Sequence, residues 1–361
     1  MSRPVLLPGL RRMWRDRNAV QFGTDPRRAV VLEFADPALV RVLDLLDGAR
    51  TEQVIIREAA RFGVTETATT QLLAVLRDGG LVVEAQTLLP TGLAEPVRRQ
   101  LAPEVAALAL RGDAIPATAL RRRTAARVLI TGYGRLVVPV AAALAQAGIG
   151  HVDPALTGRT RPDDATLGGL LPTDTDRPRA TAAAEAVTRA APATQVGPMR
   201  DGTATFVVQV GAQRPAGLTA LAYSRRRVPH LVVDIRDGVA MVGPLVPPAG
   251  SPCLNCVDLH RQDRDPAWPA LVAQLATGPE SPPLCSVTTL LSTVAYTVDE
   301  VLSYLDGRTP QTIGMTIEIS GPGRERRRTW ASHPACDCVR RHRPEALRPQ
   351  EGSQSQRDEV Q

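Results

Sequence analysis

Four of the five cysteines stand in two close pairs whose residue type and spacing suit a metal ion. Cys253 and Cys256 are separated by two residues, and Cys336 and Cys338 by one. Zinc in structural sites takes four ligands in a tetrahedron, and two local pairs that folding brings together supply four thiolates. We therefore predict a structural Zn²⁺ site here, in which His333 could replace Cys338 as a ligand. Disulfide bonds are the competing interpretation, and they are uncommon in cytoplasmic proteins.

The fifth cysteine, Cys285, stands alone in the segment PPLCSVTTLL, where we predict that a helix begins. The N-terminus of a helix can lower the pKa of a thiol and make it reactive. An isolated cysteine also serves as a small buried apolar residue. We favour the buried role for Cys285, and we predict no catalytic residue in this chain.

A glycine-rich turn precedes the cysteine pairs in the segment VLITGYGRLVVPVAAALAQAGIG. A strand-like run leads into Gly132 and Gly134 and a helix-like run follows, which is the order found in nucleotide-binding turns. Val137 takes the place of the third glycine of that motif, while Asp153 supplies the acidic residue expected at the end of the second strand. The same pattern also suits a tight turn that needs glycine for structural reasons alone.

The elements that would hold these residues alternate between strands and helices from Ala126 onward. This alternation predicts an α/β domain with a doubly wound parallel sheet, Rossmann-like, over residues 126–343. Beyond the first cysteine pair we expect a polar, proline-rich loop at 258–283, a helix at 286–305 and a strand in the segment IGMTIEIS.

The first 85 residues read as a separate small unit. Strand-like runs at 5–7, 19–22 and 29–33 are followed by three helix-like segments and the closing strand LVVEA, which predicts a winged helix-turn-helix. Asp36-Pro37 and Thr65 are typical helix starts. We expect a linker at 86–125 with one helix near 103–111, and a disordered polar tail at 344–361.

The composition is that of an ordinary soluble protein, with 43% hydrophobic and 22% charged residues. No segment has the uninterrupted apolar length of a membrane span and no signal peptide is evident, so we expect a cytoplasmic protein. The formal charge is +6 and every basic side chain is arginine. The arginine clusters at 121–123, 225–227 and 324–328 lie apart, and we interpret them as solvated faces rather than a nucleic-acid surface.

The order of these motifs resembles the ThiF/MoeB superfamily, the adenylating enzymes related to ubiquitin-activating proteins. The resemblance covers about 125–343 and rests on the segments GYGRLVVPVAAALAQAGIGHVD, PCLNC, PPLCSVTTLLSTVAYTVDEVLSYLDG and HPACDC. It implies that the two cysteine pairs bind zinc. It also implies an ATP site in which Asp153 would bind the ribose and Arg179 would stand where the family has a phosphate-binding lysine.

Three departures from the family pattern fall in this nucleotide site. The Asn-Arg-Gln segment expected after Asp153 is not recognisable, and Arg179 is a poor substitute for a compact ammonium group at a crowded phosphate. Gly211-Ala212-Gln213 stands where the family has a metal-binding aspartate, so Mg²⁺ would lack a carboxylate ligand. The pattern makes ATP a doubtful cofactor and predicts that adenylation is lost.

The N-terminal unit resembles the RiPP recognition element (PqqD-like) of proteins that make thiazole- or oxazole-modified (TOMM) peptides, through PVLLPGLRRMWRDRNAVQF, LLDGARTEQVI and LLAVLRDGGLV. In that family a leader peptide is added as a strand beside the third strand and third helix, a mode that uses main-chain hydrogen bonds. The resemblance therefore implies peptide contacts at Ala29, Val30, Val31, Leu32, Glu33, Gln71, Leu72 and Val75. It also implies a YcaO-type cyclodehydratase as partner, and relatives commonly form homodimers.

We therefore predict a leader-peptide-binding scaffold that presents a precursor peptide to a separate modifying enzyme. An active adenylyltransferase that activates the C-terminal carboxylate of a carrier protein is the alternative. A purely structural partner with no peptide ligand is a third possibility. DNA binding is disfavoured because the third helix of the N-terminal unit offers only Gln71 and Arg77 for base contacts and carries acidic residues.

Overall fold

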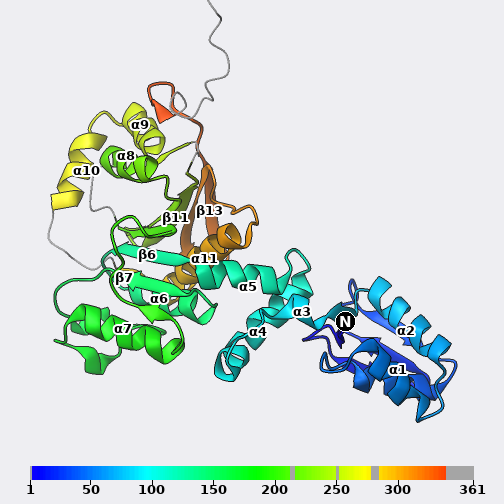
Figure 1. The fold of residues 1–361 in the computed structure, drawn as a ribbon. Coiled ribbons are helices and arrows are strands. Elements are labelled where there is room, and N and C mark those ends of the chain that lie inside the picture. Colours follow the sequence, from blue (N-terminus) through cyan, green and yellow to red (C-terminus); the bar gives the residue numbers. More distant parts are fainter. Residues whose placement is uncertain (1, 212–215, 249–251, 278–283, 339–361) are drawn as a thin grey trace, which may run out of the picture.

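The computed structural model describes residues 2–211, 216–248, 252–277 and 284–338. Figure 1 shows a small N-terminal unit joined by a helical segment to a larger α/β domain. No helix in the described ranges is long and apolar enough to cross a membrane.

The N-terminal unit holds two small antiparallel sheets and three helical segments. Strands β2, β3 and β4 form one sheet in that order, and β1 pairs with β5 in the other. The elements are β1 (Pro4–Leu6), β2 (Arg12–Trp14), β3 (Ala19–Phe22), β4 (Val30–Glu33), the 3₁₀ helix η1 (Pro37–Leu45), α1 (Glu52–Ala60), α2 (Glu66–Asp78) and β5 (Val82–Glu84). The predicted order is present, with β2 in addition. β2 is only three residues long and shows no alternation of apolar and polar residues, so the sequence did not indicate it.

Local chemistry explains where these helices begin. Asp36 accepts a hydrogen bond from the N–H of Ala38 at the start of η1, and Thr65 accepts one from Ala68 at the start of α2. The apolar faces of η1, α1 and α2 meet the strands in one core that includes Val20, Leu43, Ile55, Leu73 and Leu76.

The segment between the two units is mostly helical, whereas a linker with one helix was predicted. It contains α3 (Ala85–Leu88), α4 (Glu95–Arg111) and α5 (Pro116–Ala125). Prolines mark the starts of α4 and α5, where a missing N–H costs nothing, and Pro103 lies inside α4. Proline count alone therefore misled the prediction of an irregular segment.

Arg123 at the end of α5 fixes this helical segment to the larger domain. Its fully buried guanidinium forms an ion pair with Asp306 (2.7 Å) and another with Glu104 (2.8 Å), and donates to the carbonyl of Ala147 (3.0 Å). Asp306 ends the long helix α11 (Val287–Asp306). The ion pair thus joins α5 to the domain core.

The larger domain is built on an eight-stranded mixed sheet with the order β13-β12-β11-β10-β9-β6-β7-β8. Strands β10, β9, β6, β7 and β8 are parallel, as predicted, and β11, β12 and β13 continue the sheet beyond β10, each antiparallel to the strand before it. The strands are β6 (Arg127–Gly132), β7 (His151–Pro154), β8 (Gln195–Val196), β9 (Phe206–Val210), β10 (His230–Arg236), β11 (Val239–Val246), β12 (Met315–Gly321) and β13 (Arg324–Thr329). The arginine cluster at 324–328 lies on the exposed edge strand β13, as expected for a solvated segment.

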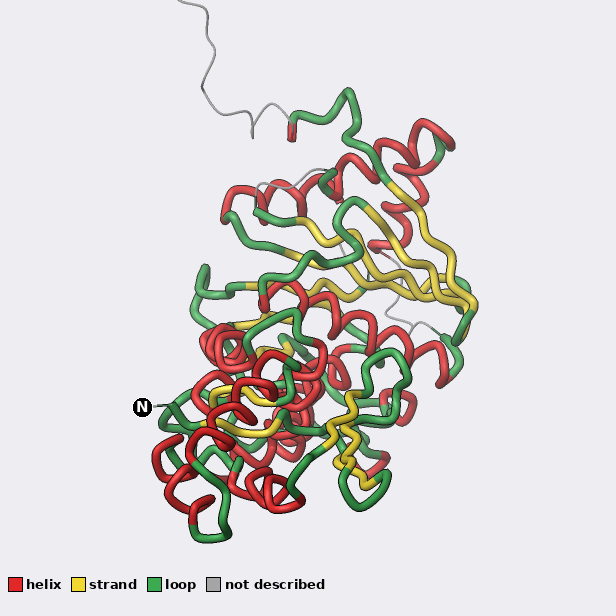
Figure 2. Tube along the Cα trace, turned by 90° about the vertical axis from the view of Figure 1, so that its right-hand side faces the viewer, coloured by secondary structure: helices red, strands yellow, loops and turns green. Residues whose placement is uncertain are grey.

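Helices cover both faces of this sheet, and Figure 2 shows its strands side by side with helices above and below them. Buried residues of α6 (Val137–Gln146), α7 (Arg179–Ala190) and α11 share one core with the strand residues on their side. Alternate residues of β9 and β10 point the other way, toward α9 (Leu254–Arg264) and α10 (Trp268–Thr277). The remaining helices are α8 (Ala216–Arg226) and the short 3₁₀ segments η2 (Pro162–Asp164) and η3 (Pro172–Asp174).

Two predictions for this domain need revision. The polar, proline-rich segment at 258–283 was expected to be a loop, but its described part forms most of α9 and all of α10. The second hairpin strand β11 was missed because it directly follows β10 across a tight turn at Asp237-Gly238. The predicted disordered tail at 344–361 lies outside the described residues.

Candidate functional site

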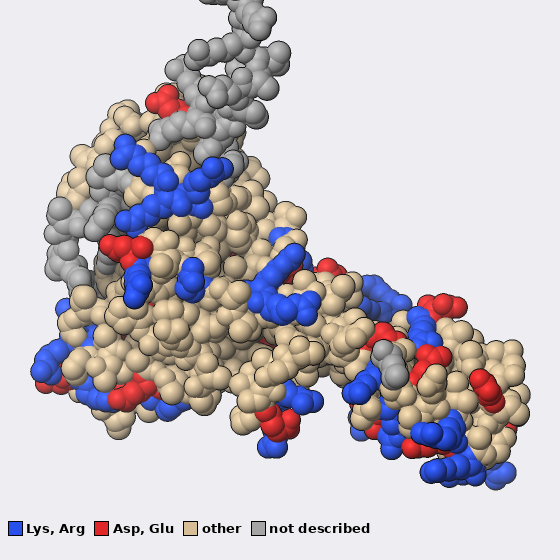
Figure 3. Space-filling view, viewed as in Figure 1, with Lys and Arg blue, Asp and Glu red and all other residues tan. Residues whose placement is uncertain are grey.

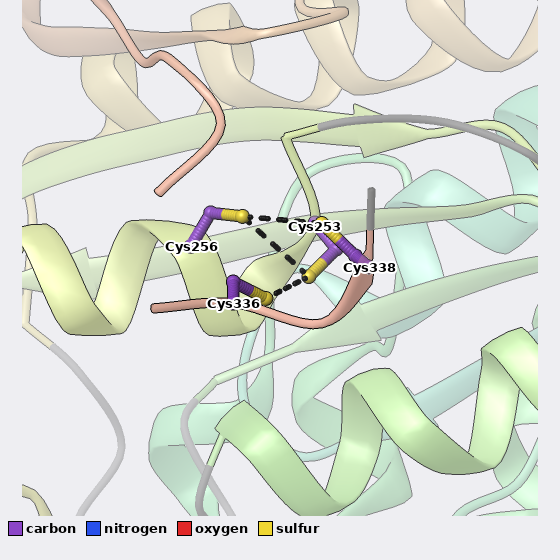
Figure 4. A group of neighbouring side chains, drawn as sticks. All are labelled: Cys253, Cys256, Cys336 and Cys338. Atoms are coloured by element: carbon purple, nitrogen blue, oxygen red, sulfur yellow. Dashed lines mark hydrogen bonds between the residues drawn. The ribbon is translucent and has the colours of Figure 1, made fainter. Parts of the chain in front are cut away.

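The four cysteines of the two pairs come together in one group (Figure 4). Cys253 caps the N-terminus of α9 and Cys256 lies in its first turn, while Cys336 and Cys338 follow β13. The Sγ atoms of Cys253 and Cys256 are 3.9 Å apart, those of Cys253 and Cys336 are 3.6 Å apart, and those of Cys256 and Cys338 are 3.4 Å apart. A tetrahedron with Zn–S bonds of 2.3 Å has S···S edges of about 3.8 Å. The group has the size that zinc requires.

The charges around this group also favour a cation. Burial and the neighbouring thiols raise the pKa of Cys256 to about 11, and burial raises the pKa of Cys253 further. Thiolates at these positions therefore need positive charge beside them. The side-chain amide of Asn255 donates to Cys336 Sγ (3.3 Å), and the main-chain N–H of His333 donates to Cys256. Such N–H···S contacts support thiolate ligands.

His333 lies outside the thiol group, where it supports the ligand loop. Its Nδ1 accepts a hydrogen bond from the N–H of Ala335 (3.1 Å), so the proton of the neutral ring is on Nε2, which donates to Asp263 (2.8 Å). Its carbonyl accepts from the N–H of Cys336 (3.0 Å). Neither ring nitrogen has a lone pair free for a metal, so this geometry favours Cys338 over His333 as the fourth ligand. The sequence did not single out Asn255 or Asp263, whose contacts depend on the fold.

Cys285 lies apart from this group and is half-buried just before α11, against the core of the domain. Burial raises the pKa of its thiol, although the guanidinium of Arg135 opposes that shift. A reactive cysteine needs a lowered pKa. The structure therefore agrees with the buried apolar role.

The glycine turn lies at the carboxyl end of β6, at the point where the strand order of the parallel sheet reverses. Ligands bind at this point in doubly wound folds. Gly132 has φ +112°, and a Cβ there would lie 1.9 Å from the carbonyl oxygen of Val210 on β9. Gly134 also has a positive φ, +102°. Contact with β9 alone is enough to require glycine at 132.

Asp153, predicted to bind the ribose, lies on β7, and Arg179, predicted to stand at the phosphate position, lies at the start of α7. Asp153 is buried, accepts a hydrogen bond from the N–H of Met199 (3.0 Å), and has its pKa raised by burial. Arg179 forms an ion pair with Asp164 (3.2 Å) and donates to the carbonyl of Thr157 (3.3 Å). Its charge is thus already compensated within the protein. The sequence predicted that residues 211–213 offer no carboxylate where the family has its metal-binding aspartate. Gly211 is described, whereas residues 212 and 213 lie outside the described residues.

In the N-terminal unit, β4 is an edge strand whose only neighbour in its sheet is β3. The N–H of Phe34 donates to the carbonyl of Asn18 (2.8 Å). In an antiparallel pair every second residue forms main-chain hydrogen bonds with the neighbouring strand, so this bond fixes which residues of β4 bond to β3. The main-chain groups of Val30 and Leu32 therefore face β3, and those of Val31 and Glu33 face away from it. Among the described residues, no main-chain partner is recorded for those of Val31 and Glu33.

The predicted peptide-contact residues divide between this edge and α2. The side chains of Val31 and Val75 are 38% and 53% exposed. Glu33 and Gln71 are exposed, whereas Ala29, Val30 and Leu32 are half-buried. Leu72 is buried in the core of the unit, so its side chain supports α2 from within.

The sequence matches no protein-family model and no curated protein. Its fold is similar to that of solved structures at low sequence identity. The structure of Escherichia coli MccB with ATP has a TM-score of 0.62 and 14% identity, covering 93% of this chain and 99% of that one. The microcin C7 biosynthetic enzyme MccB in complex with N-formylated MccA has a TM-score of 0.60 and 12% identity, with the same coverage. PaaA has a TM-score of 0.61 and 15% identity, covering 89% and 98%. At this identity the likeness shows the fold alone, and that fold agrees with the α/β domain that the resemblance implied.

Proposed function

We propose that this protein is a peptide-binding scaffold for the modification of a ribosomally made precursor peptide, and that its ThiF-like domain does not adenylate. The observation that carries the proposal is the outward edge of β4, where Val31 and Glu33 present main-chain groups and the side chain of Val31 is exposed. An extended peptide can pair with such an edge and bury that side chain at the same time. The fold neighbour MccB has been solved with MccA, which supports a peptide ligand for this fold.

A strand added at this edge would contact two different surfaces. Val30 and Leu32 point toward the core shared with α2, while Val31 and Glu33 point to the opposite face. Alternate peptide side chains would therefore meet either α2, with its exposed Val75, or the face of Val31. Apolar residues at every second position of the leader peptide would fit this arrangement. We also propose that the N-terminal unit is a PqqD-like winged helix.

The proposed loss of adenylation rests on the charges at the nucleotide position. The chain has no lysine, and the arginine nearest to that role, Arg179, is paired with Asp164. A phosphate would have to compete with this carboxylate for the guanidinium. Modification of the peptide would then require a separate enzyme, for which a YcaO-type cyclodehydratase is our candidate. We further propose a homodimer, and Zn²⁺ as the ion held by the four cysteines.

The experiment pairs two substitutions at one edge position. Short peptides encoded beside the gene would be titrated against the full chain, with binding read by fluorescence anisotropy. Val31→Pro removes one outward N–H without removing a bond to β3, and should weaken binding by about threefold to tenfold. Val31→Thr keeps the N–H and the branched shape, so it should bind like the parent. Equal binding by both variants would show that β4 is not the docking edge.

An active adenylyltransferase remains the second candidate function, because Asp153 and the glycine turn stand at the switch point of the sheet and MccB has been solved with ATP. ATP–pyrophosphate exchange by the pure protein separates the two. Exchange that is abolished by Asp153→Ala would establish the enzyme and overturn the scaffold.

A further inference from the structure

The three-stranded sheet of the N-terminal unit has a second free edge, on β2, at the opposite side of the sheet from β4. The N–H of Arg15 donates to the carbonyl of Ala19 (2.9 Å). By the alternation of an antiparallel pair, the main-chain groups of Met13 and Arg15 face β3, and those of Arg12 and Trp14 face away from it. Among the described residues, no main-chain partner is recorded for those of Arg12 and Trp14.

The hairpin that contains this edge, residues 11–18, carries an excess of positive charge. It has four arginines and one aspartate, whereas the rest of residues 1–85 has eight arginines and ten acidic residues. Arg12 forms an ion pair with Asp44 (2.6 Å). The other three arginines are exposed, and no carboxylate in the described part of the chain lies within ion-pair distance of them: Arg11, Arg15 and Arg17. Figure 3 shows both signs of charge on the N-terminal unit, with basic side chains gathered at its lower end. The positive charge of the unit is therefore local.

Trp14 gives this edge an apolar surface as well, because its side chain is 57% exposed. Charged side chains on a free edge strand commonly protect it from aggregation, so the arginines alone would need no partner. A large exposed aromatic ring does not protect an edge, because it leaves in water an apolar area that a partner can bury. The combination indicates an edge that binds a partner of opposite charge.

We propose that the β2 edge binds an acidic, extended segment of a second protein, which adds a strand beside β2. The outward main-chain groups of Arg12 and Trp14 would pair with that strand. Side chains alternate along β2, so Arg11, Met13 and Arg15 share the face of the sheet that lies away from the core. A partner with the order acidic-x-apolar-x-acidic would place carboxylates opposite Arg11 and Arg15 and an apolar residue opposite Met13.

Two other occupants suit this edge less well. A second copy of this chain would bring the same excess of arginine to the other side of the interface, and like charges directly opposite each other are destabilising. A nucleic acid would neutralise the arginines, but it has no peptide groups to pair with the edge. The inference does not depend on peptide binding at β4. On the proposed scaffold function, the modifying enzyme is the protein expected to carry the acidic segment.

Labelled peptides of defined order test the proposal on the full-length protein by fluorescence anisotropy. A soluble peptide that contains Glu-Thr-Val-Thr-Glu should bind about tenfold more tightly than its counterpart with Lys-Thr-Val-Thr-Lys. A peptide that contains Glu-Glu-Thr-Thr-Val has the same charge without the alternation, and it should bind less tightly than the first. Equal binding of the two acidic peptides would show charge attraction without strand pairing and would overturn the proposal. Tighter binding of a single-stranded DNA oligonucleotide would overturn the choice of partner.

Matched charge variants then locate the site. Arg11→Gln combined with Arg15→Gln should weaken binding of the Glu-Thr-Val-Thr-Glu peptide by about threefold to tenfold. Arg57→Gln combined with Arg61→Gln removes two exposed arginines at α1 in the same unit, and should leave binding unchanged. Circular dichroism would check the fold of each variant. Equal effects of the two double variants would refute the assignment to the hairpin.

Two single variants separate the β2 edge from the β4 edge. Trp14→Ala should weaken binding of the acidic peptide and leave the titration of the leader peptides unchanged, whereas Val31→Pro should do the reverse. Failure of the leader peptides to bind at all would end the proposal for β4 without touching the one for β2. Loss of acidic-peptide binding in Val31→Pro would place that peptide on β4 and overturn the inference. Sedimentation velocity adds a check on the second copy: a dimer that dissociates in Trp14→Ala would show that another chain covers β2, which also overturns it.

Discussion

On the proposal that the four-cysteine group holds Zn²⁺, removal of the metal is expected to destabilise the larger domain by about 4.5 kcal/mol. The perturbation is a chelator, or Cys256→Ser in a fully buried position. The folded chain holds Cys253 beside Cys336 and Cys256 beside Cys338, which are 83 and 82 residues apart. An unfolded chain can also bind zinc through these thiols, but it must first close a loop of that length.

The loop length sets the magnitude. Closing a loop of about 83 residues costs roughly 15 cal/mol/K of chain entropy, or about 4.5 kcal/mol at 25 °C. The folded site therefore binds zinc more tightly than the unfolded chain by about this amount, and that difference is the stabilisation the metal gives. For a domain of roughly 150–250 residues, 1 kcal/mol shifts the Tm by about 2–4 °C. A loss of about 9–18 °C is expected.

Thermal unfolding followed by circular dichroism, with zinc measured by mass spectrometry, is the assay. The parent should carry one zinc per chain and lose it together with the Tm shift on chelation. Cys256→Ser should reproduce the shift, and Cys285→Ser, whose thiol lies outside the group, should retain both zinc and Tm. A parent that shows no Tm change on chelation, or a Cys285→Ser variant that loses zinc equally, would refute the reasoning.

Four further predictions concern the residues around the site and the core. His333→Ala should retain one zinc per chain with affinity reduced about tenfold to a hundredfold, measured by chelator competition; complete loss of zinc would make His333 a ligand. Burial lowers the pKa of His230 to about 4 from 6.5, so the unfolded chain takes up the proton first as the pH falls. Stability should therefore drop by about 3 kcal/mol between pH 6.5 and pH 4, and urea unfolding of His230→Leu should lose this dependence. Arg123→Met should cost about 3–5 kcal/mol in urea unfolding because it leaves Asp306 buried without its partner, and Arg123→Met with Asp306→Leu should recover most of the loss. Gly132→Ala should prevent folding of the larger domain, seen as loss of soluble protein, because its Cβ would meet the Val210 carbonyl at 1.9 Å.

The parts of the fold that the sequence predicted are those with short-range signals. Alternating apolar runs and turn glycines located β6, α6, β7, α7 and β9 because each element carries its own periodicity. The grouping of the four cysteines could be predicted because the ligands of structural zinc sites usually come in local pairs. Thr65 and Asp36 predicted helix starts because a capping side chain acts within three residues.

The parts that were missed depend on contacts between distant residues. Helix α9 was interpreted as part of a polar loop because its inward face includes charged residues such as Arg261. Helix α10 contains no charged residue and was missed together with it. The aliphatic stem and planar guanidinium of arginine can pack on tryptophan rings. Arg261 therefore occupies a position where the sequence pattern predicts an apolar residue. Composition alone could not show that Trp268 and Trp330, sixty-two residues apart, would meet at one arginine.

The glycine turn by itself does not indicate that this chain binds a nucleotide. The charged residues Arg179 and Asp164 say more about whether a phosphate can bind. Gly132 is required by the approach of β9 whether or not a nucleotide binds, so its presence is explained without ATP. Strand packing does not require an arginine at position 179. The guanidinium of Arg179 forms an ion pair with Asp164. Asp164 is itself buried and also accepts from the N–H of Arg161 (2.8 Å), so it is held in place to meet that charge. Asp164→Asn is therefore the substitution that tests whether a phosphate site is blocked. If ATP binding, measured by calorimetry, appears only in Asp164→Asn, the ion pair closes the site; if the parent binds ATP equally well, the proposed loss of adenylation has no basis in these charges.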